Sequence, residues 1–137
     1  MNTFQVQREL AKEPGFRGVF ARDRIPLVRG KDKSLIFNTL PSTSHPDEEG
    51  HWIALYFTED TVEYFDVSGM PPVIKSYLRR CIQPKIVYHN RPIQSPYSVA
   101  CGMFCIDFIK RRLRGEEFAE IVSSFSNHLL FNDFLVQ

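Results

Sequence analysis

Two aromatic-rich segments separated by a short turn constrain the fold of this chain more than any other feature. Residues 51–57 (HWIALYF) and residues 61–66 (TVEYFD) are dense in aromatic and branched side chains, and residues 58–60 (TED) lie between them. This arrangement predicts two antiparallel strands joined by a tight turn. Because antiparallel pairing brings the start of one strand to the end of the next, we expect His51 and Asp66 to lie side by side.

The remaining sequence predicts one domain, residues 1–137, that contains both strands and helices. With 43% hydrophobic residues, the chain can bury a core without disulfides or a structural metal. Residues 16–30 contain several glycine and proline breakers and are predicted to form a loop. Apolar runs and helical spacing predict the other elements: strands over residues 34–39 and 85–88, and helices over residues 3–12, 72–81, 101–114 and 116–130.

Charge and cysteine usage narrow the class of protein. The formal net charge of +1 gives no support for general attraction to nucleic acid or to an anionic membrane. No apolar run reaches the roughly 18 residues of a membrane span, and the first residues lack the pattern of a secretory signal. The three cysteines, an odd number, are therefore expected to be reduced thiols in an intracellular compartment. No paired Cys/His spacing predicts a metal site.

A second stretch, residues 94–102 (QSPYSVACG), carries reactive groups. Cys101 is predicted to begin a helix, where the positive end of the helix dipole favours a thiolate. Gly102 would let a substrate backbone approach, and Gln94, seven residues before Cys101, could donate its amide N–H to a developing oxyanion. Together with the expected His–Asp pair, these are the groups that a cysteine hydrolase needs: nucleophile, base, orienting carboxylate and oxyanion donor.

Each of these assignments has a simpler alternative. Cys101 could be a small buried core residue, which is the usual role of a single cysteine, and Gln94 an ordinary loop amide. His51 could be a surface histidine in a turn. Glu63 competes with Asp66 as the orienting carboxylate, and alternation along a strand puts the two on opposite faces. We favour Asp66 because it is expected to lie opposite His51 in the hairpin.

The other histidines and the basic clusters are predicted to be structural. His45, His89 and His128 lack a comparable context and are expected to be surface or packing residues. The basic stretches 79–80 and 110–114 lie at predicted helix C-termini, where cations are favoured, so they are expected to be solvated helix ends. Without interleaved aromatic residues they give only weak support for a nucleic-acid role.

Several of these motifs, in this order along the chain, carry a resemblance to a protease family. The matching segments are residues 18–20 (GVF), 35–39 (LIFNT), 51–52 (HW), 64–66 (YFD), Gly69 and 94–105. The chain resembles the adenovirus-type cysteine endopeptidases (adenains), in the clan that also contains the SUMO- and ubiquitin-like-specific proteases. Its motifs are most similar to those of proteases from Polinton/Maverick-type transposons and their virus relatives.

The resemblance implies an α+β, papain-like or adenain-like fold, with a mixed central sheet flanked by helices and the nucleophile at a helix N-terminus. It also implies a set of roles: His51 as general base, Asp66 as its orienter, Gln94 as oxyanion donor, Cys101 as nucleophile, and Trp52 and Gly102 as substrate-binding residues. The adenovirus enzymes carry Glu in the third catalytic position, whereas this chain has Asp66, as the cellular branch of the clan does.

The resemblance further implies an endopeptidase that cleaves capsid and core precursor proteins during virion maturation. No cofactor is expected for the chemistry itself. An activating peptide or DNA is suggested by the family analogy alone, and Cys81 does not match the spacing of the cysteine that tethers the peptide in that family. The expected enzyme is a monomer without a membrane partner, acting in the host-cell nucleus or cytoplasm and in the virion.

Two other functions remain open at the level of sequence. One is a ubiquitin- or SUMO-deconjugating isopeptidase of the same clan, although 137 residues leave little surface for docking a folded modifier. The other is a catalytically silent binding module, which would have no need of all four reactive groups.

Overall fold

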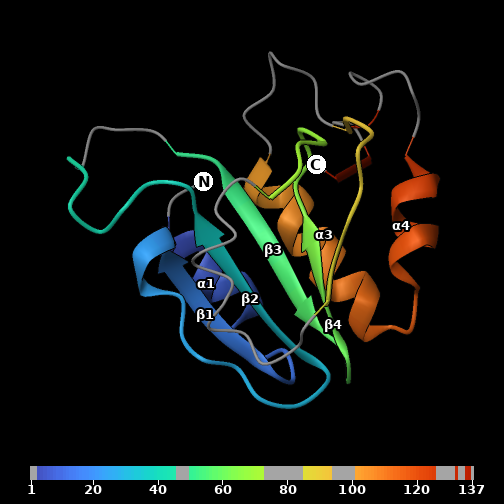
Figure 1. Cartoon of the computed structure of the whole chain (residues 1–137), viewed down its shortest axis with the longest axis horizontal. Helices are drawn as coiled ribbons and strands as arrows, with labels where there is room; N and C mark the ends of the chain where they lie inside the picture. Colours follow the sequence, from blue (N-terminus) through green and yellow to red (C-terminus); the bar gives the residue numbers. More distant parts are fainter. Residues whose placement is uncertain are drawn as a thin grey trace.

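A computed structural model of the chain describes residues 3–45, 50–72, 85–93, 101–125, 132 and 135–136. Within these ranges the chain forms one five-stranded sheet with helices packed on it (Figure 1). The elements are α1 (Thr3–Leu10), β1 (Phe16–Ala21), the 3-10 turn η1 (Arg22–Arg24), β2 (Lys33–Asn38), β3 (Trp52–Phe57), β4 (Thr61–Phe65), β5 (Lys85–Tyr88), α3 (Cys101–Leu113) and α4 (Phe118–Ser124).

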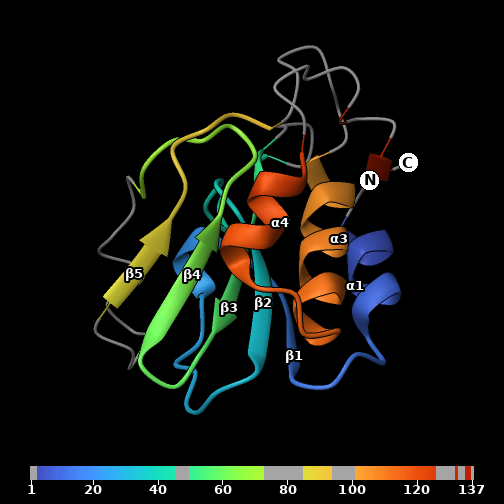
Figure 2. The same cartoon turned by 90° about the vertical axis from the view of Figure 1, so that its right-hand side faces the viewer.

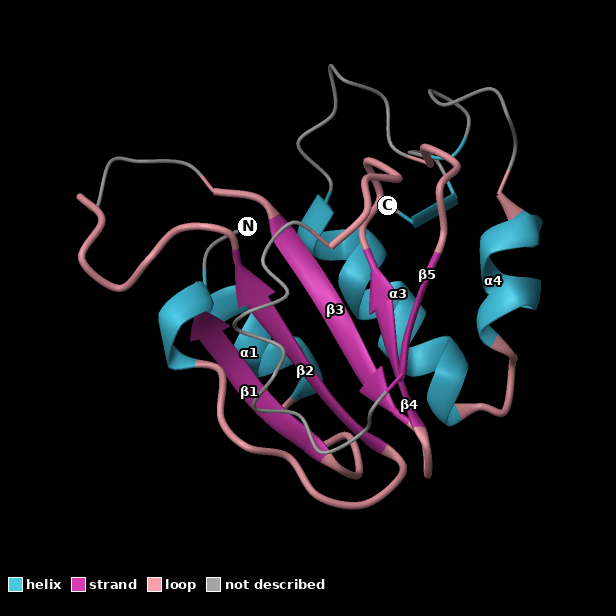
Figure 3. Cartoon of the chain, in the orientation of Figure 1, coloured by secondary structure: helices cyan, strands magenta, loops and turns pink. Residues whose placement is uncertain are grey.

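The sheet is mixed, with strand order β1-β2-β3-β4-β5. Strands β2, β3 and β4 pair antiparallel, whereas β1 pairs with β2 and β5 pairs with β4 in parallel. Helices α1, α3 and α4 lie together on one face of the sheet, as the view in Figure 2 and the colouring by secondary structure in Figure 3 show. This arrangement confirms the predicted α+β class and the hairpin of β3 and β4.

Both faces of the central strands are buried, which explains why their sequences are nearly continuous apolar runs. On the helix face, Phe65 of β4 stacks on Phe108 of α3 with ring centroids 4.5 Å apart. On the other face, Leu55 of β3 belongs to a core cluster that is closed by Ile25 and Val28 from the loop before β2. The Phe65–Phe108 contact therefore holds the middle of α3 against β4 on the helix face of the sheet.

Residues 16–30 contain a strand, so the predicted loop is wrong at its N-terminal part. β1 is an edge strand whose register shifts between Phe16 and Val19. Gly18 has a φ of +124°, and the Val19 N–H donates to the Gln7 side-chain oxygen at 3.1 Å. Because this irregular strand depends on pairing with β2 and on a contact from α1, its own sequence lacks the alternation that would reveal it.

The predicted helix over residues 116–130 is also too long. α4 starts with a capping box formed by Glu117 and Glu120 and ends at Ser124. Phe125 has extended backbone angles, φ −86° and ψ 142°, and its ring meets the edge of Phe104 at a centroid distance of 5.5 Å. Packing of this aromatic ring on α3 stops the helix where apolar spacing alone would continue it.

The basic end of α3 differs from its prediction as well. The helix ends at Leu113, one residue before its predicted end, and Gly115 adopts a φ of +95°. Arg112, however, is only 10% exposed and forms a two-pronged ion pair with Glu63, at 2.7 Å and 3.2 Å. The prediction of a fully solvated helix end is therefore wrong, because the guanidinium reaches back to β4 to neutralise a buried carboxylate.

Some predictions fall outside the described residues. They are the helix over residues 72–81 beyond Pro72, the basic pair 79–80, and Cys81, Gln94 and His128. Among the helices that the structure describes, none is both long enough and apolar enough to cross a membrane.

Candidate active site

His51 and Asp66 meet at the open end of the β3–β4 hairpin. His51 Nε2 lies 2.6 Å from Asp66 Oδ1. The strand register pairs Ala54 with Phe65, so the two residues lie beyond the paired ladder and are not direct cross-strand partners, which corrects the expected register. Because Nε2 faces the carboxylate, Nδ1 is the ring nitrogen left for a second partner.

The turn that follows β4 holds the Asp66 carboxylate in place. The backbone N–H and the hydroxyl of Ser68 both donate to Asp66 Oδ1, at 2.9 Å and 2.7 Å. Burial by itself raises the pKa of Asp66, but the hydrogen bonds from His51 and Ser68 and the charge of His51 outweigh it and lower this pKa. Asp66 is therefore an ionised carboxylate that accepts a hydrogen bond from His51.

The backbone of His51 is fixed from the β2 side. The His51 N–H donates to the Thr39 hydroxyl at 3.0 Å, and the Thr39 N–H donates to the His51 carbonyl at 2.9 Å. A Cβ at Gly50 would lie 1.7 Å from the Asn38 side-chain oxygen, so a larger residue there would require the Asn38 side chain to move. Sequence reasoning missed Thr39, Gly50 and Asn38 in this role, because they lie on a different strand and in a loop.

Cys101 is the first residue of α3 and is half-buried. Burial raises the pKa of its thiol, but the hydrogen bond and charge of His51, with backbone hydrogen bonds of Trp52 and Gly102, bring the pKa below its ordinary value. Burial lowers the pKa of His51, but hydrogen bonds and charges of Asp66 and Cys101 outweigh it and raise this pKa to about 9. Together the shifts favour a thiolate–imidazolium pair.

The Trp52 backbone lies between two thiols. Its amide hydrogen-bonds Cys101, and its carbonyl accepts the Cys105 thiol at 3.5 Å. Cys105 is fully buried, and burial raises its pKa well above the ordinary value, so it stays a neutral thiol. Its position four residues after Cys101, on the same side of α3, is the sequence signal for this contact.

For Trp52 and Gly102 the structure gives burial and contacts but does not test the predicted roles. Trp52 is half-buried and packs against the core cluster between the sheet and the helices. Gly102 is buried, and its backbone hydrogen-bonds the Cys101 sulfur. The substrate-binding roles of both residues stay predictions, as does the oxyanion role of Gln94, which lies outside the described residues.

The alternatives to Asp66 and His51 have other partners in the structure. Glu63 pairs with Arg112 on the helix face and does not reach His51. His89 is a buried packing residue between the rings of Phe65 and Phe118, and burial lowers its pKa. In the described part of the chain, no cluster of three or more His, Cys, Asp or Glu side chains could hold a metal ion.

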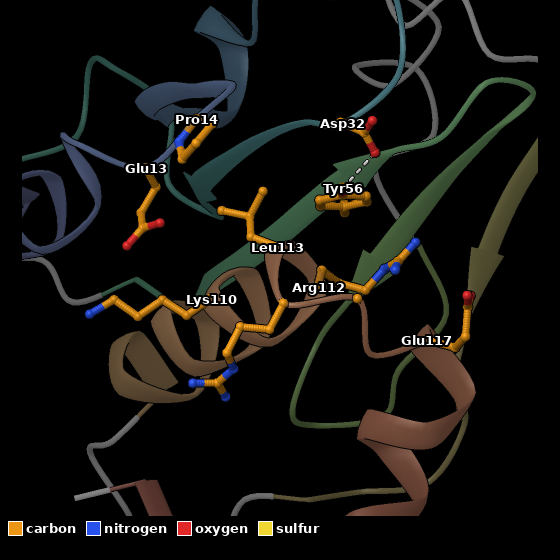
Figure 4. A pocket seen from close by; sticks show the side chains of 10 residues that line it. Glu13, Pro14, Asp32, Tyr56, Lys110, Arg112, Leu113 and Glu117 are labelled. Atoms are coloured by element: carbon orange, nitrogen blue, oxygen red, sulfur yellow. Dashed lines mark hydrogen bonds between the residues drawn. The ribbon is translucent and has the colours of Figure 1, made fainter.

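A hollow of about 660 Å³ lies near the opposite end of β3 from His51 (Figure 4). Three of its lining side chains, Asp32, Tyr56 and Arg112, contact one another or a neighbouring carboxylate. The Tyr56 hydroxyl donates to Asp32 Oδ1 at 2.9 Å, and Arg112 lies 4.4 Å above the Tyr56 ring while it pairs with Glu63. The reactive groups of His51, Asp66 and Cys101 meet near the other end of the strand.

No protein-family model and no curated protein sequence matches this chain. Among solved structures, the ASFV pS273R protease is similar, with a TM-score of 0.61 and 15% identity over 99% of this chain and 67% of that chain. A selenomethionine form of the same protease matches with a TM-score of 0.48 and 21% identity over 76% of this chain and 44% of that chain. The first likeness shows that this chain shares the fold of a protease.

Proposed function

We propose that this chain is a cysteine endopeptidase in which Cys101 is the nucleophile, His51 the general base and Asp66 the orienting carboxylate. One observation carries this proposal. The His51 imidazole hydrogen-bonds the buried Asp66 carboxylate at 2.6 Å, and it also hydrogen-bonds the thiol of Cys101, the first residue of α3. A fold shared with the ASFV pS273R protease supports the same reading.

The chemistry follows from the charges of these groups. The Cys101 thiolate attacks the scissile carbonyl and forms a tetrahedral oxyanion, which the Cys101 backbone N–H and the predicted Gln94 amide would stabilise. His51 then donates its proton to the leaving amine, and a thioester remains on Cys101. His51, now neutral, deprotonates a water molecule that attacks the thioester, so that the acyl group leaves as the acid product and the thiolate–imidazolium pair is restored. Asp66 keeps the imidazole oriented and favours its charged form throughout.

We further propose that the substrates are capsid and core precursor proteins of a virus or virus-like element, cleaved as particles mature. This finer proposal is supported by the motif resemblance to adenovirus-type endopeptidases described above. The site would therefore act on extended polypeptide segments.

The test is turnover of a peptide library by the wild-type protein, Cys101→Ala and the matched control Cys81→Ala, with reductant and with or without added DNA. We expect cleavage by the wild type and the control and none by Cys101→Ala. Cleavage that survives in Cys101→Ala would refute the mechanism. A covalent adduct with ubiquitin or SUMO vinyl sulfone, without peptide cleavage, would replace the endopeptidase with a deconjugating enzyme.

A further inference from the structure

The turn that holds Asp66 rests on a neighbouring segment, residues 89–93. Gly69 has a φ of +73°, and a Cβ there would lie 2.7 Å from the Arg91 carbonyl carbon, 2.8 Å from Pro92 N and 2.9 Å from the Arg91 oxygen. The Gly69 N–H donates to the Asp66 carbonyl at 2.9 Å. The turn thus has no free space on the side of this segment.

The contact continues along the segment as a hydrogen bond. The Ile93 N–H donates to the Val67 carbonyl at 2.8 Å, and both side chains are buried. The Ile93 carbonyl in turn accepts the Asn132 side-chain amide at 3.0 Å. Val67, between Asp66 and Ser68, is therefore hydrogen-bonded to residues 89–93, and Gly69, directly after Ser68, is packed against them.

Arg91 attaches the segment to the end of α4. Its Nη2 donates to the carbonyls of Val122 and Phe125, at 2.7 Å and 2.5 Å. These carbonyls belong to the last turn of α4 and the residue after it, and the Val122 carbonyl also accepts the Phe125 N–H at 3.3 Å. The Arg91 carbonyl accepts the Nδ1–H of His89 at 3.0 Å, which fixes the backbone from the other side.

We propose that Arg91 is a positioning residue for the catalytic pair, one that holds residues 89–93 against the Asp66 turn and so keeps the carboxylate aligned with His51. The proposal rests on the proposed function and adds a residue that does not touch the reacting atoms. A shift of the segment would move the Ser68–Gly69 turn and displace the Asp66 carboxylate. The 2.6 Å hydrogen bond between Asp66 and the His51 ring would then become longer and weaker.

The titratable groups around His51 and Asp66 determine which pKa would change if the Asp66 turn moved. His51 is faced by Asp66 from the turn and by Cys101 from α3. Asp66 also acts electrostatically on His89 from the segment itself, on Tyr64 from β4 and on Cys105 from α3. The imidazole is the group whose charge responds.

The test compares Gly69→Ala, Arg91→Met and Arg91→Lys with the wild type. The matched control is Gly115→Ala, since Gly115 also has a positive φ of +95° but has nothing within 4 Å of its Cβ position. Two readouts are made on variants with the wild-type circular dichroism spectrum: the NMR titration of His51 and the pH dependence of Cys101 alkylation by iodoacetamide. A purely structural role would lower thermal stability and leave both titrations in place.

We expect the His51 midpoint to fall by about one pH unit in Gly69→Ala and Arg91→Met, with thiolate formation moving to higher pH. Arg91→Lys should recover part of the shift, because an ammonium can reach one of the two carbonyls. Gly115→Ala should titrate like the wild type. Titrations in the folded variants that coincide with the wild type would overturn this inference alone, whereas an ordinary, unshifted Cys101 in the wild type would overturn the proposed function with it.

Discussion

Replacing Asp66 with asparagine is the most direct test of the electrostatics of the site, because it removes the charge and keeps the shape. Burial opposes the charged imidazole, yet hydrogen bonds and charges of Asp66 and Cys101 raise the pKa of His51 from 6.5 to about 9. This rise of about 2.5 pKa units (9 − 6.5) corresponds to about 3 kcal/mol in favour of the imidazolium, at about 1.36 kcal/mol per unit.

Asp66 contributes both a hydrogen bond and a charge, each ahead of the matching contribution from Cys101. We therefore expect Asp66→Asn to lower the His51 pKa by at least about one unit, a tenfold loss in the equilibrium that favours the imidazolium. The thiolate–imidazolium pair loses stability to the same extent. Thiolate formation should then move to higher pH, and acylation at neutral pH should slow by about tenfold or more.

The assay is the NMR titration of the His51 ring, assigned by loss of its signal in His51→Ala, together with the rate of Cys101 alkylation across the pH range. Glu63→Gln is the matched control, since it removes a buried carboxylate that pairs with Arg112 and not with His51. A His51 midpoint that stays near 9 in folded Asp66→Asn would refute the reasoning, because it would mean that Asp66 does not stabilise the charged ring.

Two further predictions concern the scaffold. Arg112→Met should destabilise the fold by about 3–5 kcal/mol in urea unfolding, because it leaves the buried carboxylate of Glu63 unpaired. The double variant Glu63→Gln/Arg112→Met should recover part of this loss. Equal stability of Arg112→Met and the wild type would contradict the prediction. Phe108→Ala should lower the free energy of unfolding by about 3–5 kcal/mol, since the Phe108 ring stacks on the ring of Phe65 with centroids 4.5 Å apart. Phe4→Ala, at a side chain 68% exposed, should change stability by less than about 0.5 kcal/mol; similar losses in both phenylalanine variants would count against the assigned core.

The accuracy of the sequence-based predictions follows the range of the interactions that create each element. The β3–β4 hairpin was predicted because both strands and their turn are contiguous, and the structure places its open end where His51 meets Asp66. The start and end of α3 were predicted from Cys101 and Gly115 for the same reason. By contrast, β1 was missed because its pairing partner lies beyond a long loop.

The polar contacts show the same difference between neighbouring residues, whose contacts the sequence predicts, and distant residues, whose contacts it does not. Strand alternation favoured Asp66 over Glu63 as the partner of His51, and the structure agrees on which carboxylate lies beside the imidazole. The same pattern could not reveal that Glu63 would be neutralised by Arg112 across 49 residues of chain. A buried ion pair of this kind is specified only when the helix packs on the sheet.

The sequence by itself determined the local elements and the order of the reactive groups, because periodicity, turn residues and short hairpins act over a few neighbouring positions. The tertiary structure decided the rest. It brought α3 to the start of β3, so that Cys101 meets His51. Three separate parts of the chain contact the His51–Asp66 pair or the turn that carries Asp66: Thr39, Ser68 and residues 89–93. Contacts between distant segments leave no periodic signal, since they exist only after the sheet and helices have packed together.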